Sequence, residues 1–173
     1  DKYVTRYVAA DGTVTVQYSD KNNSGTVLKA GDGVLPNGAE FKQSVVKSGT
    51  AYDTAAAAVS AMLPNTTNFF VYQFDITANG VDIHALSNYV KVTLSRPADL
   101  VIGEGQQLVV YRLEDNGTLT RCESAVNANS ISFLTNHFST YIFSVENVNG
   151  TATTTDAAAN ASNGSAKSPK TGE

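Results

Sequence analysis

The sequence predicts a mainly β protein: an antiparallel β-sandwich with one short helix, followed by a disordered C-terminal tail. Short apolar or alternating segments recur up to about residue 148 with turn residues between them, which is typical of a sandwich or barrel. One alanine-rich stretch has the composition of a helix, and the composition changes abruptly after Val148. The chain has 173 residues, so one hydrophobic core is the simplest arrangement.

Two hairpins are marked by turn dipeptides. Asp11-Gly12 and Asn116-Gly117 each place a glycine where a tight turn needs positive φ, and strand-like segments flank both. The expected hairpins pair 3–9 with 13–18 and 108–113 with 119–122.

Further strands follow from apolar content and alternation. The segment 68–77 is apolar enough to predict a central strand covered on both faces. Apolar residues at Val90, Val92 and Leu94 alternate with polar ones, which predicts a strand with one face in the core, and Pro97 should end it. The remaining expected strands are 41–47, 131–133 and 141–145.

The helix is expected over 50–63. Thr50 can act as its N-cap and Asp53 as the capping-box partner, while Pro64 should stop it. Apolar residues recur at helical spacing, so the helix should lie across an end or a face of the sandwich. These residues are Tyr52, Ala55, Val59 and Met62.

Composition excludes several classes of partner. The net charge of −4 and the pI of about 5.1 provide no basic surface, so we expect no nucleic acid. No stretch approaches the roughly 20 apolar residues of a membrane span, so no membrane contact is expected within this chain. Cys122 is the single cysteine, which rules out an intrachain disulfide, and its sequence context favours a half-buried strand residue over a nucleophile.

No metal site, cofactor site or catalytic constellation can be assembled from the sequence. His84, His137 and Cys122 do not make a recognisable zinc set. The run from Asp20 to Ser24 imitates the first half of an EF-hand loop, but Gly31 stands where the bidentate glutamate belongs. We therefore expect no metal, no cofactor and no enzyme activity.

The C-terminal end carries the most informative motif. Residues 149–167 contain little besides Thr, Ala, Asn, Ser and Gly, which predicts a flexible linker after a β-sandwich domain at 1–148. The last residues, 168–173, include Ser168, Pro169, Lys170, Thr171 and Gly172.

This stretch resembles the Leu-Pro-x-Thr-Gly sorting signal of Gram-positive wall proteins, with Ser168 in place of the usual leucine as in variant clostridial signals. The resemblance implies that sortase cleaves after Thr171 and joins that residue to peptidoglycan. Sortase and peptidoglycan are the implied partners, and the implied location is extracellular, in the cell wall of a Gram-positive bacterium.

The folded part resembles a module of surface proteins from clostridia and other gut Firmicutes. The most recognisable stretch runs from Thr135 to Tyr141 and contains His137, Phe138 and Tyr141, which we expect to form a structural motif, a packed corner. The resemblance implies an immunoglobulin-like or ZU5-like β-sandwich with no known catalysis. The other matching stretches are 34–38, 48–52, 70–76 and 90–94.

Together these patterns favour a non-enzymatic, wall-proximal stalk or spacer. The alternative is an adhesin domain that binds a host surface protein or glycan, which an exposed apolar or aromatic patch would favour. A variant of the spacer is stapled by an internal Lys-to-Asn isopeptide bond, for which lysines 2, 29, 42, 47 and 91 are available.

Overall fold

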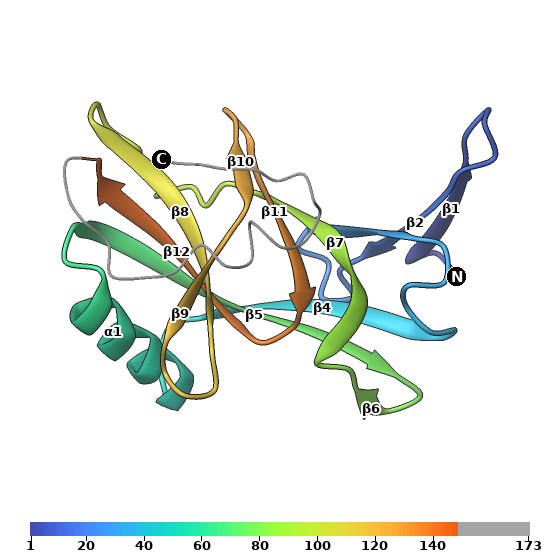
Figure 1. Ribbon diagram of the computed structural model, residues 1–173, viewed down its shortest axis with the longest axis horizontal. Helices are drawn as coiled ribbons and strands as arrows, with labels where there is room; N and C mark the ends of the chain where they lie inside the picture. The colour runs from blue at the N-terminus through green and yellow to red at the C-terminus, as the bar shows by residue number, and fades with distance from the viewer. Residues whose placement is uncertain (149–173) are drawn as a thin grey trace.

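The computed structural model describes residues 1–148. Two antiparallel sheets pack face to face, and one helix lies outside the second sheet (Figure 1). The predicted antiparallel β-sandwich with one short helix is therefore confirmed. The tail at 149–173, with the expected linker and sorting motif, lies outside the described residues.

The first sheet, called sheet A, contains six strands, and every neighbouring pair is antiparallel. Its edges are β1 and β10. In spatial order the strands are β1 (Val4–Val8), β2 (Val14–Ser19), β3 (Val27–Gly31), β7 (Ala85–Ser95), β11 (Ser130–His137) and β10 (Ser124–Val126).

The second sheet, sheet B, has β12 near its centre, paired with β5 on one side and β8 on the other. Its edges are β4 and β9, and the short β6 pairs with the end of β5. In spatial order the strands are β4 (Ala39–Val46), β5 (Thr66–Ala78), β12 (Thr140–Asn147), β8 (Gln106–Leu113) and β9 (Leu119–Cys122), with β6 at Val81–Asp82.

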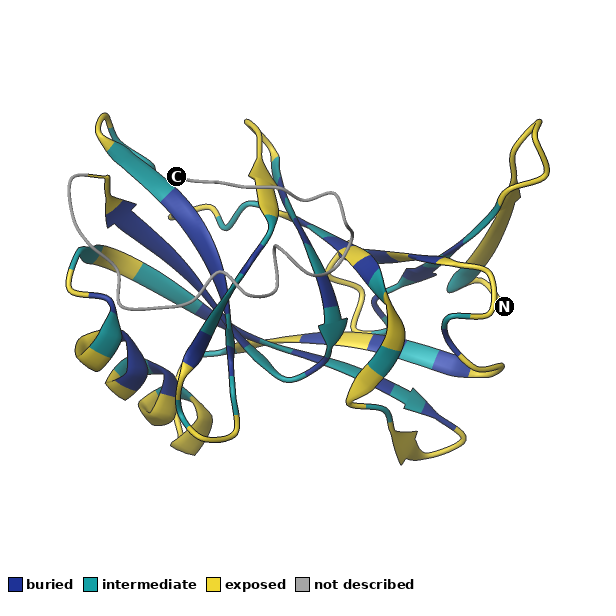
Figure 2. Ribbon diagram, viewed as in Figure 1, coloured by how far each residue is buried: buried dark blue, intermediate teal, exposed yellow. Residues whose placement is uncertain are grey.

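The main core fills the space between the two sheets, because alternate residues of each strand point inward. Its centre is aromatic: Phe133 of sheet A lies 5.0 Å from Tyr141 and 5.6 Å from Phe74 of sheet B, measured between ring centroids. Each such buried side chain contributes about 1.5–3 kcal/mol through removal from water. Figure 2 shows the burial concentrated in the central strands, whereas the β1–β2 hairpin is mostly exposed.

The helix, α1 (Thr50–Met62), covers part of the outer face of sheet B (Figure 1). Ala55, Ala58 and Val59 are its buried residues, and they belong to a second apolar cluster with residues such as Val71 and Ile142. The helix therefore packs on a face of the sandwich, which is one of the two positions predicted.

The predicted cap of this helix is wrong. Gly49, with φ of 88°, is the N-cap residue, and no side chain makes a capping hydrogen bond, so neither Thr50 nor Asp53 has the role expected. The backbone N–H of Asp53 instead donates to the Gly49 carbonyl over 2.9 Å. Asp53 does remain in the first turn, where its charge favours the positive end of the helix dipole.

The long strand β5 is central, as predicted, but it is covered on both faces along only part of its length. Val71 contacts the helix-side cluster while Phe74 points into the main core. Beyond the helix, the outer-face residues Gln73, Asp75 and Thr77 are only half-buried. The sequence could not show where the helix stops covering the strand, because the crossing position depends on packing.

Candidate functional site

The sorting motif, which the sequence puts forward as the functional site, lies outside the described residues. What the structure describes is the strand that leads toward it. That strand, β12, is held by β5 and β8 on its two sides, and Tyr141 to Glu146 are all buried. The chain therefore leaves the described domain from a buried strand that is paired on both sides.

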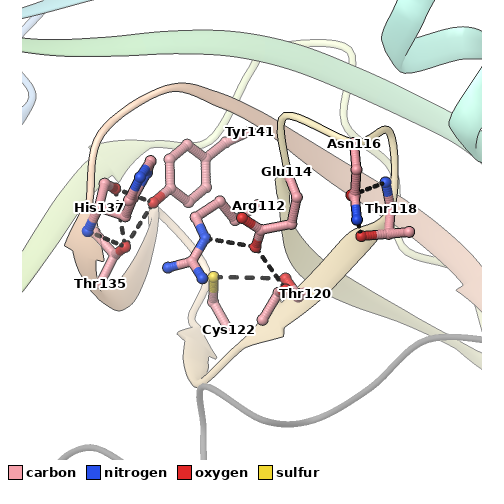
Figure 3. Close-up of polar contacts among 9 residues, drawn as sticks. All are labelled: Arg112, Glu114, Asn116, Thr118, Thr120, Cys122, Thr135, His137 and Tyr141. Carbon is pink, nitrogen blue, oxygen red and sulfur yellow. Dashed lines mark hydrogen bonds and ion pairs between the residues drawn. The ribbon is translucent and has the colours of Figure 1, made fainter. Parts of the chain in front are cut away.

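The residues His137, Phe138 and Tyr141 lie at the turn from β11 to β12. Figure 3 shows His137 and Tyr141 together with Thr135. The Tyr141 ring is fully buried, and its hydroxyl donates to the backbone carbonyl of His137. The same hydroxyl lies 2.5 Å from Oγ1 of Thr135. Phe138 is buried, and its ring packs edge-on against that of Phe41 in β4, an edge strand of sheet B. The arrangement ties the turn to the strand that follows it.

The imidazole of His137 takes no part in that tie. Its Nδ1 is buried and has no hydrogen-bond partner within the described residues, whereas the backbone N–H and C=O of His137 are both used. Burial, with the nearby Arg112 guanidinium, lowers the pKa of His137, so the ring is neutral at neutral pH. The histidine contributes through its backbone and the packing of its ring.

Beside this turn lies a polar cluster contributed by β8 and β9 (Figure 3). Nε of Arg112 donates to Oε2 of Glu114 over 2.7 Å, and Oγ1 of Thr120 donates to the same oxygen over 2.6 Å. Both charged side chains are about three-quarters buried or more, which holds the pair in one geometry. The guanidinium and the carboxylate therefore pair with each other at the β8–β9 turn.

Cys122 is fully buried next to this cluster, more deeply than the half-buried position expected. Burial raises its pKa to about 12, so the sulfur carries its proton at neutral pH. Because the thiolate is the reactive form, this cysteine has the properties of an apolar core residue. Its thiol donates to the carbonyl of Thr120 over 3.9 Å.

The loop that imitates half of an EF-hand uses its carboxylate for a different purpose. Asp20 is buried, and its two oxygens accept backbone N–H groups of Asn22, Ser24 and Gln43 at 2.8–3.0 Å. These bonds occupy the oxygens that a cation would need. Among residues 1–148, no group of three His, Cys, Asp or Glu side chains is placed to hold a metal ion.

The candidate lysines for an isopeptide bond are all exposed, at positions 2, 29, 42, 47 and 91. Such a bond requires an unprotonated amine beside a carboxamide, and burial is what removes the proton from a lysine. These five side chains lie in water, so none has that environment.

A groove of about 470 Å³ lies between the β1–β2 hairpin and the segment 31–39. Its apolar lining includes Val16, Tyr18 and Leu35, and the ion pair between Arg6 and Asp32 stands over it. The two Arg6 nitrogens reach the two carboxylate oxygens at 2.7 and 3.4 Å. The lining also includes polar residues such as Asn37, so the groove has mixed polarity.

The pairing of Arg6 with Asp32 could not be predicted from the sequence. The two residues lie 26 positions apart, and only the antiparallel order of β1, β2 and β3 brings them together. The Asp11-Gly12 turn predicts that β1 pairs with β2, but no sequence pattern predicted the strand β3.

Comparisons with known protein families, with curated proteins and with solved structures found no match to this chain. Within residues 1–148, no helix has the length and apolar character needed to cross a membrane.

Proposed function

We propose that this chain is a wall-proximal spacer of a bacterial surface protein, attached to peptidoglycan by sortase through Thr171. In this proposal residues 1–148 form a non-enzymatic stalk module, 149–167 connect it to the sorting motif, and Ser168 to Gly172 are recognised by sortase. The protein acts outside the cell, in the wall of a Gram-positive bacterium.

The positions of the two ends of the described domain carry the proposal. Asp1 lies toward one end of the long axis of the molecule, while β12 finishes toward the opposite end (Figure 1). A segment joined at Asp1 would therefore be held a domain length away from a wall joined on the far side. A spacer needs this in-line arrangement.

The way β12 is held also suits a domain that transmits tension. A pull on the C-terminal side acts along β12, which is paired with β5 from Thr140 to Glu146 and with β8 from Tyr141 to Asn147. Such a pull loads many backbone hydrogen bonds together, because they lie perpendicular to the strand. Anchoring through this strand thus uses a strand that is paired on both sides along almost its whole length.

The test is a sortase reaction on the full chain extended by a few residues after Glu173. Incubation with sortases of several classes and an amine acceptor should yield a product cleaved after Thr171 and carrying the acceptor, identified by mass. Thr171→Ala and Pro169→Ala should abolish the product, and Ser165→Ala in the same tail should leave it unchanged. If none of the sortases cleaves the chain, anchoring through this motif is refuted.

The second candidate function is adhesion, and the groove beside β1 is the observation that favours it. Its lining of mixed polarity, which includes the Arg6–Asp32 ion pair, suits a polar ligand such as a host glycan. Glycan-array binding by the full chain that is lost on Asp32→Ala and kept on Asp53→Ala would support adhesion over a pure spacer. Binding insensitive to Asp32 would exclude this groove as the ligand site.

A further inference from the structure

The four sheet edges of the sandwich differ in how they are protected. An edge strand presents unpaired backbone N–H and C=O groups, and soluble proteins keep such edges short or cover them. The edges are β1 and β10 in sheet A, and β4 and β9 in sheet B.

The loop that begins at Asp20 covers the β4 edge. The Lys21 N–H donates to the Phe41 carbonyl over 2.9 Å, and the Gln43 N–H donates to Asp20 Oδ1 over 2.9 Å. The Asn22 side chain then donates to the Gln43 carbonyl, also over 2.9 Å. Three outward groups near the middle of this eight-residue strand, at Phe41 and Gln43, are therefore occupied.

The β9 and β10 edges are protected by their length. They contain four and three residues, respectively, so neither offers a continuous row of backbone groups. The carbonyl of Glu123, which lies between β9 and β10, accepts the N–H of Leu134 and is therefore already paired.

β1 has neither form of protection. Two bonds show which residues of β1 hydrogen-bond to β2. The Ser19 N–H donates to the Tyr3 carbonyl, and the Ala9 N–H donates to the Thr13 carbonyl. Because antiparallel pairing alternates, the backbone groups of Val4, Arg6 and Val8 face away from β2. Within residues 1–148 only the Val4 N–H among them is taken, by the carbonyl of Asp1 at 3.2 Å.

The side chains of β1 are also exposed. Tyr7 is 49% exposed and Val8 67%, and the hairpin that carries them projects from the body of the sandwich (Figures 1 and 2). An uncovered strand with apolar side chains is a template for another strand.

We propose that β1 pairs with β1 of a second copy of this chain, antiparallel about a two-fold axis at Arg6, so that sheet A continues through both copies. Arg6 then lies opposite Arg6 of the second copy in a hydrogen-bonded pair, and Val4 lies opposite Val8. In this register the unpaired backbone groups of the two strands face each other. The N–H of each Arg6 donates to the carbonyl of the other Arg6, and the N–H of each Val8 donates to the Val4 carbonyl of the other copy.

Charge and side-chain pairing favour a second copy as the occupant. Each Arg6 is already bound to Asp32 at 2.7 Å, and both side chains are about half exposed. The two-fold axis brings together two guanidinium and two carboxylate groups with no net charge, so the facing arginines are neutralised. On the other face Tyr7 lies opposite Thr5 of the second copy, an aromatic and β-branched pair that stabilises antiparallel strands.

The first test is the oligomeric state of the full chain, measured by sedimentation from micromolar to millimolar concentration. The wild-type chain should form a dimer in this range. Arg6→Pro removes an outward N–H that β2 does not use, and proline is tolerated on edge strands, so this variant should stay folded and become monomeric. Arg6→Ala keeps the N–H and should still dimerise. Wild-type chain that is monomeric throughout refutes the proposal.

The second test measures the register of the β1–β1 pairing and does not require the Arg6→Pro variant to fold. Hydrogen-bonded antiparallel pairs have Cα atoms about 5.5 Å apart, within the range of disulfides. The Arg6→Cys chain should therefore form an intermolecular disulfide rapidly under mild oxidation. Thr13→Cys, at the hairpin tip and exposed, should do so far more slowly, because the antiparallel arrangement separates the two tips. Equal rates for the two variants would overturn the proposed pairing.

Discussion

Tyr111 donates a hydrogen bond from its hydroxyl to the carboxylate of Glu146, 2.7 Å away, on the side of sheet B that carries the helix. Glu146 is only 6% exposed. Burial is the main influence on this carboxyl and raises its pKa above 4.5, although the bonds from Tyr111 and Ser144 oppose the shift.

The first prediction concerns the pH dependence that Glu146 imposes. A raised pKa means that the folded chain binds a proton at the Glu146 carboxyl more tightly than the unfolded chain does. The stabilisation from this protonated carboxyl is therefore complete at pH values below the pKa of the unfolded chain. The stabilisation is lost as the pH rises through the pKa of the folded chain. Glu146→Gln should flatten this part of the stability curve, measured by denaturant unfolding from pH 4 to 8. An unchanged curve would contradict the burial of the charge.

The second prediction compares the contributions of the Tyr141 hydroxyl and the His137 ring to the stability of the β11–β12 turn. Tyr141→Phe removes the hydroxyl that bonds both the Thr135 hydroxyl and the His137 carbonyl, which then keep their 3.1 Å bond to each other. The loss of two bonds should cost about 1–2 kcal/mol in unfolding free energy. His137→Ala removes a ring whose Nδ1 has no partner in the described chain, so it should cost less. Chemical denaturation of both variants gives the comparison, and a larger loss for His137→Ala would reverse the assignment.

The third prediction concerns the loop on the β4 edge. Asp20→Ala removes the acceptor of three backbone N–H groups and should cost at least about 2 kcal/mol. Asp20→Asn keeps an oxygen for Asn22 and Gln43 and should cost about half as much. A chelator should leave the melting temperature of the wild-type chain unchanged, because the carboxylate is already occupied. Stabilisation by added calcium would show that the loop opens to bind it.

The fourth prediction is that the Cys122 thiol is unreactive in the folded protein. Because its pKa is about 12, the sulfur stays protonated, whereas an alkylating reagent reacts with the thiolate. Because the side chain is buried, the reagent also cannot reach the sulfur. Iodoacetamide at mildly alkaline pH should add no mass to the native chain and one adduct to the unfolded chain. Rapid labelling of native protein would mean that β9 opens locally.

The fifth prediction follows from the corrected helix cap. Gly49 has φ of 88° and ψ of −173°, a conformation that is accessible almost only to glycine. No atom lies within 4 Å of the position of an added Cβ, so Gly49→Ala should cost about 1–3 kcal/mol from backbone strain alone. Thr50→Ala should change stability by no more than about 0.5 kcal/mol. Thermal unfolding of the pair distinguishes the two capping arrangements.

The local elements of this protein could be predicted because their causes lie within a few residues. Gly12 and Gly117 both have φ of 87°, so each predicted hairpin has its glycine at the positive φ that was expected. The helix ends at Met62, next to Leu63 and before Pro64, because proline cannot continue it. Alternation placed Val90, Val92 and Leu94 in the core correctly.

The candidate site could be predicted only in part. The sorting motif is a property of the sequence alone and stays a prediction. The edge position of β1, the occupied oxygens of Asp20 and the pairing of Arg6 with Asp32 depend on which strands become neighbours.

By itself, the sequence determined the β class, both hairpins and the extent of the helix, since φ preferences and periodicity act over short distances. Only the tertiary structure decided that β12 lies between β5 and β8, that β3 joins β2 to β7, and that Glu146 is buried. These features come from strands distant in the sequence, and their order is set by which arrangement buries both sheet faces against each other and against the helix.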